Sequence, residues 1–242
     1  MIIDEPAEIL PGITEIPETP PENKRYCALV IAGICLSLMM RPYLGQFFLI
    51  WDMSPTQRLI EGEMLEWVVA GAMFLYAWYA EGTKFFLWQE KKYSAGFYIG
   101  SAVVIFLLQI GAAWVSRVPF YLGFHENNAV ARRIAAILLS SPMLLAGACL
   151  TAGIIEEFIF RGYILSRLSL FFKNQHWPVI ISALIFASVH LAYKTVHELI
   201  FAFLIGLIFG YYYQWYRNLT VLIIVHFAID FVAFNSYRHF LR

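Results

Sequence analysis

Long apolar stretches recur along this chain, and they constrain its fold more than any other feature. A helix needs about 20 mostly apolar residues to cross a bilayer. Hydrophobic residues make up 60% of the sequence and charged residues only 14%, whereas soluble domains carry about 25% charged residues. The mean hydropathy is +0.66. The sequence therefore predicts an all-α, multi-pass integral membrane protein with membrane lipid as a partner.

Seven membrane spans are expected from the apolar stretches. They cover residues 26 to about 40, 64–80, 95–116, 134–152, 177–192, 198–215 and 219–234. Residues 154–172 also have a helical pattern and form an eighth candidate, either partly re-entrant or continuous with the preceding helix. Arg41-Pro42 interrupts the first region, so that span either ends there or kinks and continues to Trp51. We therefore expect a bundle of about eight transmembrane helices.

The first 24 residues have a different composition. They contain five prolines and six acidic residues, and they end at a lysine. Such a segment buries too little apolar area to offset its ordering entropy, so residues 1–24 are predicted to be a disordered tail. Residues 25–242 then form one membrane domain. The net charge is zero, which gives no indication of a nucleic-acid partner. A compact chain with a short tail suggests a prokaryotic inner (plasma) membrane.

One apolar segment carries three ionisable side chains within six residues, Glu156-Glu157-Phe-Ile-Phe-Arg161. A charged side chain at mid-bilayer costs about 2.5–3.5 kcal/mol on insertion scales, so it marks a functional site by default. Glu157 and Arg161 are four residues apart and share a helical face, which favours an ion pair. Glu156 points about 100° away and is left to face solvent or substrate. A purely structural charge cluster that locks helices together is the alternative.

Two further polar pairs follow in apolar segments, Phe186-Ala-Ser-Val-His190 and His226-Phe-Ala-Ile-Asp230. Phe186 should pack beside the imidazole of His190 and help to fix its rotamer. The carboxylate of Asp230 can orient the imidazole of His226, supply a second metal ligand beside it, or form a satisfied buried pair. If the bundle turns these groups inward, it encloses one polar, water-accessible cavity.

The remaining histidines and the other hydrolase motifs give no stronger candidate. Four histidines are expected near helix ends or in loops, in solvated positions: His125, His176, His197 and His239. The sequence has no HExxH zinc helix, no Gly-x-Ser-Gly elbow and no Gly-x-Gly-Asp aspartyl signature. A Glu/His/His/Asp set remains, and it is suited to activating water.

In these three motifs the chain resembles the CPBP family (CAAX protease and bacteriocin-processing, also called Abi) of intramembrane proteases. The type II CAAX prenyl endopeptidases belong to that family. Its pattern is Glu-Glu-x-x-x-Arg, Phe-x-x-x-His and His-x-x-x-Asn or Asp, and this chain matches the order and the spacing of all three. The motif-bearing half covers about residues 149–236.

The resemblance implies an intramembrane endopeptidase that hydrolyses a peptide bond in a membrane-tethered or lipidated protein, including a prenylated CAAX-type protein. It implies that Glu156 and His190 activate the attacking water. His226 and Asp230 would support the tetrahedral oxyanion, while Glu157 and Arg161 would be structural. The fold that it implies is a bundle of about eight transmembrane helices with an internal cavity.

A zinc-dependent mechanism is the alternative chemistry, with Glu156, His190 and His226 as ligands and Asp230 as a fourth or outer group. The prenyl-endopeptidase branch typically has Asn at the last motif position. Asp230 can donate a hydrogen bond to an oxyanion only when it is protonated. When ionised, it would orient His226 or bind a metal.

Two other function classes fit the same residues. A non-enzymatic scaffold or bacteriocin-immunity protein would keep the motifs for structure. A proton-coupled transporter would use Glu and His side chains as a relay, but the polar clusters occur only in the C-terminal half, with no sign of an inverted repeat. The complete set of Glu156, His190 and His226 favours the enzyme.

Overall fold

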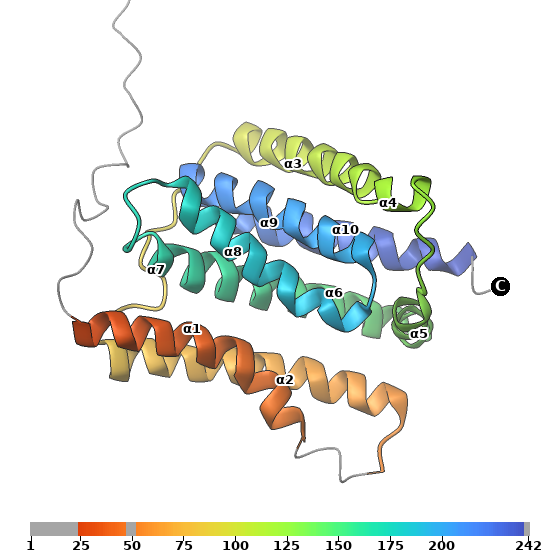
Figure 1. Cartoon of the computed structure of the whole chain (residues 1–242), viewed down its shortest axis with the longest axis horizontal. Helices are drawn as coiled ribbons and strands as arrows, with labels where there is room; N and C mark the ends of the chain where they lie inside the picture. Colours follow the sequence, from red (N-terminus) through yellow and green to blue (C-terminus); the bar gives the residue numbers. More distant parts are fainter. Residues whose placement is uncertain (1–23, 47–51, 240–242) are drawn as a thin grey trace, which may run out of the picture.

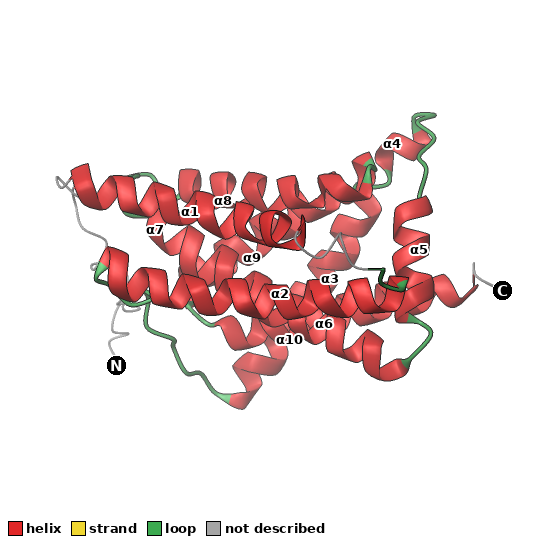
Figure 2. Cartoon of the chain, turned by 90° about the horizontal axis from the view of Figure 1, so that it is seen from below, coloured by secondary structure: helices red, strands yellow, loops and turns green. Residues whose placement is uncertain are grey.

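The computed structural model describes residues 24–46 and 52–239, and every regular element within them is a helix (Figures 1 and 2). The elements are α1 (Lys24–Gly45), α2 (Pro55–Tyr76), η2 (Ala77–Glu81), α3 (Ala95–Val115), α4 (Val118–Tyr121), α5 (Ala129–Leu138), α6 (Pro142–Glu156), η3 (Glu157–Leu165), α7 (Ser166–Leu168), α8 (His176–Val189), η4 (His190–Tyr193), α9 (Val196–Tyr216), α10 (Leu219–Ser236) and η5 (Tyr237–His239). The prediction of an all-α fold is confirmed. Residues 1–23, which hold nearly all of the predicted tail, lie outside the described residues.

The helices form three groups. Helices α1 and α2 pack together as a hairpin, and α2 contacts α6 (Figure 1). Helices α6 and α10 pack along each other, as do α8 and α9, and π-helix η3 contacts α8, α9 and α10. Helix α3 covers the opposite side, against α9 and α10. The segment with the Glu-Glu-Arg motif therefore lies between the hairpin and the other helices.

Five helical stretches in the described residues are long and apolar enough to cross a membrane. They cover Ala95–Tyr121, Pro142–Leu168, His176–Tyr193, Val196–Tyr216 and Leu219–His239. Large apolar side chains such as Leu107, Trp114 and Leu184 are exposed on these helices, as expected for surfaces that contact lipid rather than water. An integral membrane protein is therefore supported, whereas the count of about eight spans and the polar cavity stay predictions.

The structure changes two of the expected boundaries. The predicted span 134–152 is wrong in its first part, because α5 ends at Leu138 and α6 begins at Pro142. Proline lacks a backbone N–H donor and is favoured in the first turn of a helix, and the Ser141 hydroxyl caps the new helix by accepting from the N–H of Leu144. Downstream, the eighth candidate is continuous with its predecessor, since the helical stretch runs unbroken from Pro142 to Leu168.

Helix α1 runs through Pro42 to Gly45, so it does not end at Arg41-Pro42. Its predicted continuation to Trp51 lies outside the described residues.

Small residues bring helices α8 and α9 into close contact. A Cβ atom added at Gly206 would lie 2.8 Å from the Cα atom of Ala183, and one added at Gly210 would lie 2.8 Å from Cγ1 of Val179. Because real Cβ atoms do not approach other heavy atoms so closely, glycine is required at both positions for this helix separation. This contact fixes α8, which ends directly before His190, relative to α9.

Candidate active site

The Glu-Glu-Arg motif lies where the backbone changes from α-helix to π-helix. Glu156 is the last residue of α6, and η3 begins at Glu157 and ends at Leu165. π-Helices are rare and occur frequently at functional sites. The two adjacent carboxylates differ in exposure, since the Glu157 side chain is 0% exposed and the Glu156 side chain 25%. The two acids therefore have different environments, as the sequence predicted.

Glu157 and Arg161 form the ion pair expected from their spacing. The Arg161 Nη1 atom donates to Glu157 Oε1 at 2.8 Å, and both side chains are buried. The guanidinium lies between two aromatic rings, 4.5 Å from the centroid of Phe186 and 5.0 Å from that of Phe209. These cation–π contacts lower the cost of burying the charge. Arg161 thus joins η3 to α8 and α9 without facing solvent.

Glu157 also contacts His226, which the sequence analysis did not foresee. Glu157 Oε1 lies 2.8 Å from Nδ1 of His226. An ionised carboxylate only accepts hydrogen bonds, so Nδ1 carries the proton in this pair. The group that orients His226 through Nδ1 is therefore Glu157, and Asp230 lies on the other side of the ring. A buried carboxylate that fixes an imidazole is a typical way to set its tautomer.

Two carboxylates face the other nitrogen of His226. Nε2 lies 3.8 Å from Glu156 Oε2 and 3.5 Å from Asp230 Oδ2. Glu156 Oε2 is buried and has no hydrogen-bond partner among the described residues. Both separations are longer than an ordinary direct hydrogen bond. The arrangement leaves Glu156, Asp230 and His226 facing one another with unused hydrogen-bonding capacity.

His190 lies where α8 ends and the 3₁₀ turn η4 begins. Its ring packs beside Phe186, with the centroids 4.9 Å apart, which confirms the expected contact. Its Nδ1 lies 3.0 Å from the carbonyl oxygen of Phe186, so Nδ1 carries the proton and Nε2 of the neutral ring has the free lone pair. His190 is also close enough to Asp230 for the two to interact electrostatically. The imidazole is therefore held in one tautomer near the other site residues.

The donor atoms of the site bear on the zinc alternative. No group of three or more His, Cys, Asp or Glu side chains within residues 24–46 and 52–239 is arranged to hold a metal ion. Three zinc ligands would have to converge on one point at about 2.0–2.2 Å from it. The described side chains do not fit such a centre, and a zinc mechanism stays a prediction.

His197 lies near a helix end, as predicted, but its side chain is not solvated. It is half-buried in the first turn of α9, with Nδ1 hydrogen-bonded to Glu126 and Nε2 lying 3.3 Å from Glu198 Oε1. Glu126 also accepts from the backbone N–H of Val196 at 2.7 Å and so caps α9. Burial opposes ionisation of Glu126, but the hydrogen bonds from His197 and from the backbone N–H groups outweigh it, and its pKa lies below the ordinary value. Glu198 extends this cluster toward Asp230, with which it interacts electrostatically.

Comparison with known proteins bears on the segment that carries the site. Residues 134–232 match the family model described as type II CAAX prenyl endopeptidase Rce1-like. No curated protein and no solved structure matches the chain. The matched range includes all three motifs, so the resemblance drawn from them is confirmed.

Proposed function

Because residues 134–232 match the model of the Rce1-like CAAX proteases, we propose that this chain is an intramembrane endopeptidase that cleaves prenylated or otherwise lipidated membrane proteins with water activated by Glu156 and His190. One observation carries the proposal. His226, held through Nδ1 by Glu157, presents its Nε2 to the carboxylates of Glu156 and Asp230. Glu156 and Glu157 come from the helical stretch Pro142–Leu168, and His226 and Asp230 come from α10. No packing role requires three carboxylates around one imidazole.

Glu156 is the general base of the proposed reaction. Its side chain is partly exposed, and its Oε2 has no hydrogen-bond partner among the residues that the structure describes. His190 assists through the lone pair on Nε2, since Nδ1 is engaged by the Phe186 carbonyl. Water held by these two groups attacks the scissile carbonyl carbon while Glu156 accepts its proton.

His226 and Asp230 act on the oxyanion that forms. In its imidazolium form His226 donates to Glu157 through Nδ1 and to the oxyanion through Nε2, and the carboxylates around it balance its charge. Collapse of the tetrahedral intermediate breaks the C–N bond, and Glu156 returns the proton to the leaving amine. The sequence is general acid–base hydrolysis, with water as the only co-substrate.

Cleavage of a farnesylated CAAX-type reporter peptide by the purified protein in liposomes tests the proposal. Glu156→Gln keeps the size of the side chain and removes the base, so we expect cleavage to fall by about 10²–10⁴-fold. Glu90→Gln is the matched control, because Glu90 is an exposed carboxylate that caps α10 through the N–H of Leu219. This variant should cleave at the rate of the unmodified chain.

Four results would each change the proposal. Equal activity of Glu156→Gln and the unmodified chain would refute Glu156 as base. Equal cleavage of a peptide without the prenyl group would refute the lipidated substrate. Bound zinc together with loss of cleavage in chelator would favour the metal-dependent alternative over a base mechanism. A folded protein that cleaves no membrane-tethered peptide would favour the non-enzymatic scaffold or immunity protein.

A further inference from the structure

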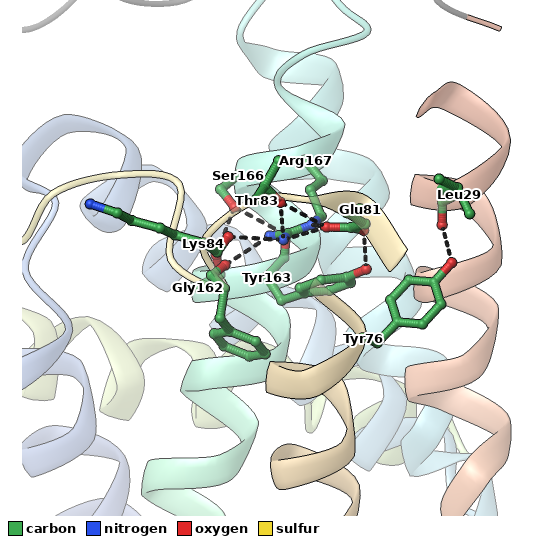
Figure 3. Close-up of polar contacts among 10 residues, drawn as sticks. Leu29, Tyr76, Glu81, Thr83, Lys84, Gly162, Tyr163, Ser166 and Arg167 are labelled. Carbon is green, nitrogen blue, oxygen red and sulfur yellow. Dashed lines mark hydrogen bonds and ion pairs between the residues drawn. The ribbon is translucent and has the colours of Figure 1, made fainter. Parts of the chain in front are cut away.

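A second buried ionic cluster lies at the other end of η3, and the sequence analysis did not find it. Glu81, the last residue of η2, contacts both Tyr163 and Arg167 (Figure 3). The Tyr163 hydroxyl donates to Glu81 Oε1 at 2.5 Å, and Arg167 Nη2 donates to Glu81 Oε2 at 2.6 Å. The side chains of Glu81 and Arg167 are both 0% exposed. The cluster joins the end of the α1–α2 hairpin to the end of the segment that carries the active-site acids.

Arg167 also donates hydrogen bonds to backbone carbonyl groups of the segment that follows η2. Nη1 donates to the carbonyl oxygen of Phe85 at 2.8 Å, and Nη2 lies 3.2 Å from that of Lys84. The guanidinium also stacks on the ring of Tyr163, 3.6 Å from its centroid. Nε donates to Glu81 Oε2 at 2.9 Å, so all three nitrogens have partners, and their directions fix the guanidinium in one orientation.

Two glycines, Gly33 and Gly162, allow close packing around the same cluster. A Cβ atom added at Gly33 of α1 would lie 1.9 Å from the Tyr163 hydroxyl, and one added at Gly162 would lie 2.6 Å from the ring of Phe86. The Phe85 and Tyr163 rings are in contact, with centroids 5.4 Å apart. Interiors packed this tightly do not deform continuously, so the end of η3 has little freedom to rotate or slide.

The cluster and the candidate active site lie at the two ends of one π-helix. Glu157 at its start is paired with Arg161 and His226, whereas Tyr163 and Arg167 near its end are paired with Glu81. A π-helix is much rarer than an α-helix. A change of η3 to α-helical hydrogen bonding would alter the rotation of Glu157 about the helix axis relative to the residues after it.

A buried ion pair contributes little net stability compared with apolar residues of the same volume, and fixing register is its best-attested role. We propose that Glu81, Tyr163 and Arg167 are positioning residues, which hold η3 in its π-helical register and thereby place Glu156 and Glu157 for the reaction. The catalytic part of this inference rests on the proposed function. The structural part, the register of η3, does not.

Three variants of increasing severity test the positioning role: Tyr163→Phe, Arg167→Lys and Glu81→Gln. Tyr163→Phe removes one hydrogen bond and keeps the ring under Arg167. Arg167→Lys keeps the positive charge and loses the planar guanidinium. Glu81→Gln removes the negative charge. We expect kcat for the prenylated peptide to fall in this order, by about tenfold or more for Glu81→Gln, with KM changed less than about twofold. Amide hydrogen exchange in residues 157–165, measured by mass spectrometry, should become faster in the same order.

Ile105→Ala is the control for a general loss of stability, because removal of a buried side chain leaves a cavity. Ile105 is buried in α3, which covers the side of the bundle opposite the α1–α2 hairpin. It should lower the unfolding temperature and leave both kcat and exchange in residues 157–165 unchanged. If the three cluster variants behave like this control, the positioning role is refuted. If the unmodified chain cleaves no peptide, the proposed function fails, and the exchange comparison alone still decides whether the cluster holds the register.

Discussion

Removal of the guanidinium of Arg161 should lower the stability of the folded protein by a large and measurable amount. In Arg161→Met the Glu157 carboxylate loses its cation while its side chain stays 0% exposed. Breaking a buried ion pair by removing one partner costs roughly 3–5 kcal/mol. Glu157 keeps its hydrogen bond to His226 at 2.8 Å, and methionine retains part of the contact with the Phe186 ring. We therefore expect about 3 kcal/mol, the lower end of that range.

A change of this size is readily measured as a shift in thermal unfolding. For chains of 150–250 residues, 1 kcal/mol corresponds to about 2–4 °C, so Arg161→Met should unfold about 6–12 °C below the unmodified chain. Tryptophan fluorescence in detergent, at one fixed scan rate, is a suitable assay, because unfolding of such proteins is commonly irreversible. The yield of folded Arg161→Met protein should fall together with its unfolding temperature.

Two further variants distinguish the effect of breaking the buried ion pair on stability from the effect of removing any arginine. Arg117→Met removes an exposed guanidinium that lies 5.8 Å from the centroid of Trp114, and a surface change of this kind should stay within about 0.5 kcal/mol. The double variant Glu157→Gln/Arg161→Met removes both charges and should unfold at a higher temperature than Arg161→Met alone. An unfolding temperature of Arg161→Met within about 2 °C of the unmodified chain would refute the reasoning, as would strictly additive effects of the two changes.

Two other predictions concern the stability of α9. Because the pKa of Glu126 is lower in the folded state than its ordinary value of 4.5, ionised Glu126 stabilises the fold above that pH, and this contribution should disappear as the pH falls through the folded pKa. The difference in unfolding temperature between the unmodified chain and Glu126→Gln should therefore shrink below about pH 4.5, and a constant difference down to pH 3 would contradict the assignment. Gly206→Val should cost about 1–3 kcal/mol, because its Cβ atom would meet the Ala183 backbone at 2.8 Å. Gly147→Ala, where no atom lies within 4 Å of the added Cβ, is the control, and equal unfolding temperatures for the two glycine variants would show that α8 and α9 do not need this contact.

The sequence predicted contacts that depend on the spacing within one helix. Glu157 and Arg161 are four residues apart and form the expected pair, and Phe186 packs on His190 at the same spacing. The prediction of an all-helical membrane fold also follows from the chain alone, since backbone polar groups in lipid must be satisfied within each segment. The Rce1-like match at residues 134–232 agrees with the motifs for the same reason, because both depend on residue types and their order.

Boundaries within the apolar sequence were less predictable. Hydropathy did not indicate that residues 134–152 contain a break, because the residues on both sides of Ser140-Ser141 are apolar and only the proline at 142 marks the new helix. The π-helical form of η3 has no signal in composition either. It depends on contacts at both ends of the segment, at Glu157 and at Arg167.

Contacts between helices were decided by the tertiary structure. Periodicity determines which side chains share one face of a helix, but the rotation of each helix and its neighbours depend on packing, such as the approach of Gly206 to Ala183. For this reason the partner of His226 at Nδ1 is Glu157 and not Asp230, which is only four residues away. For the same reason Glu81 pairs with Arg167, which lies 86 residues further along the chain. The sequence determined which groups could do chemistry, and only the packed helices decided which of them meet.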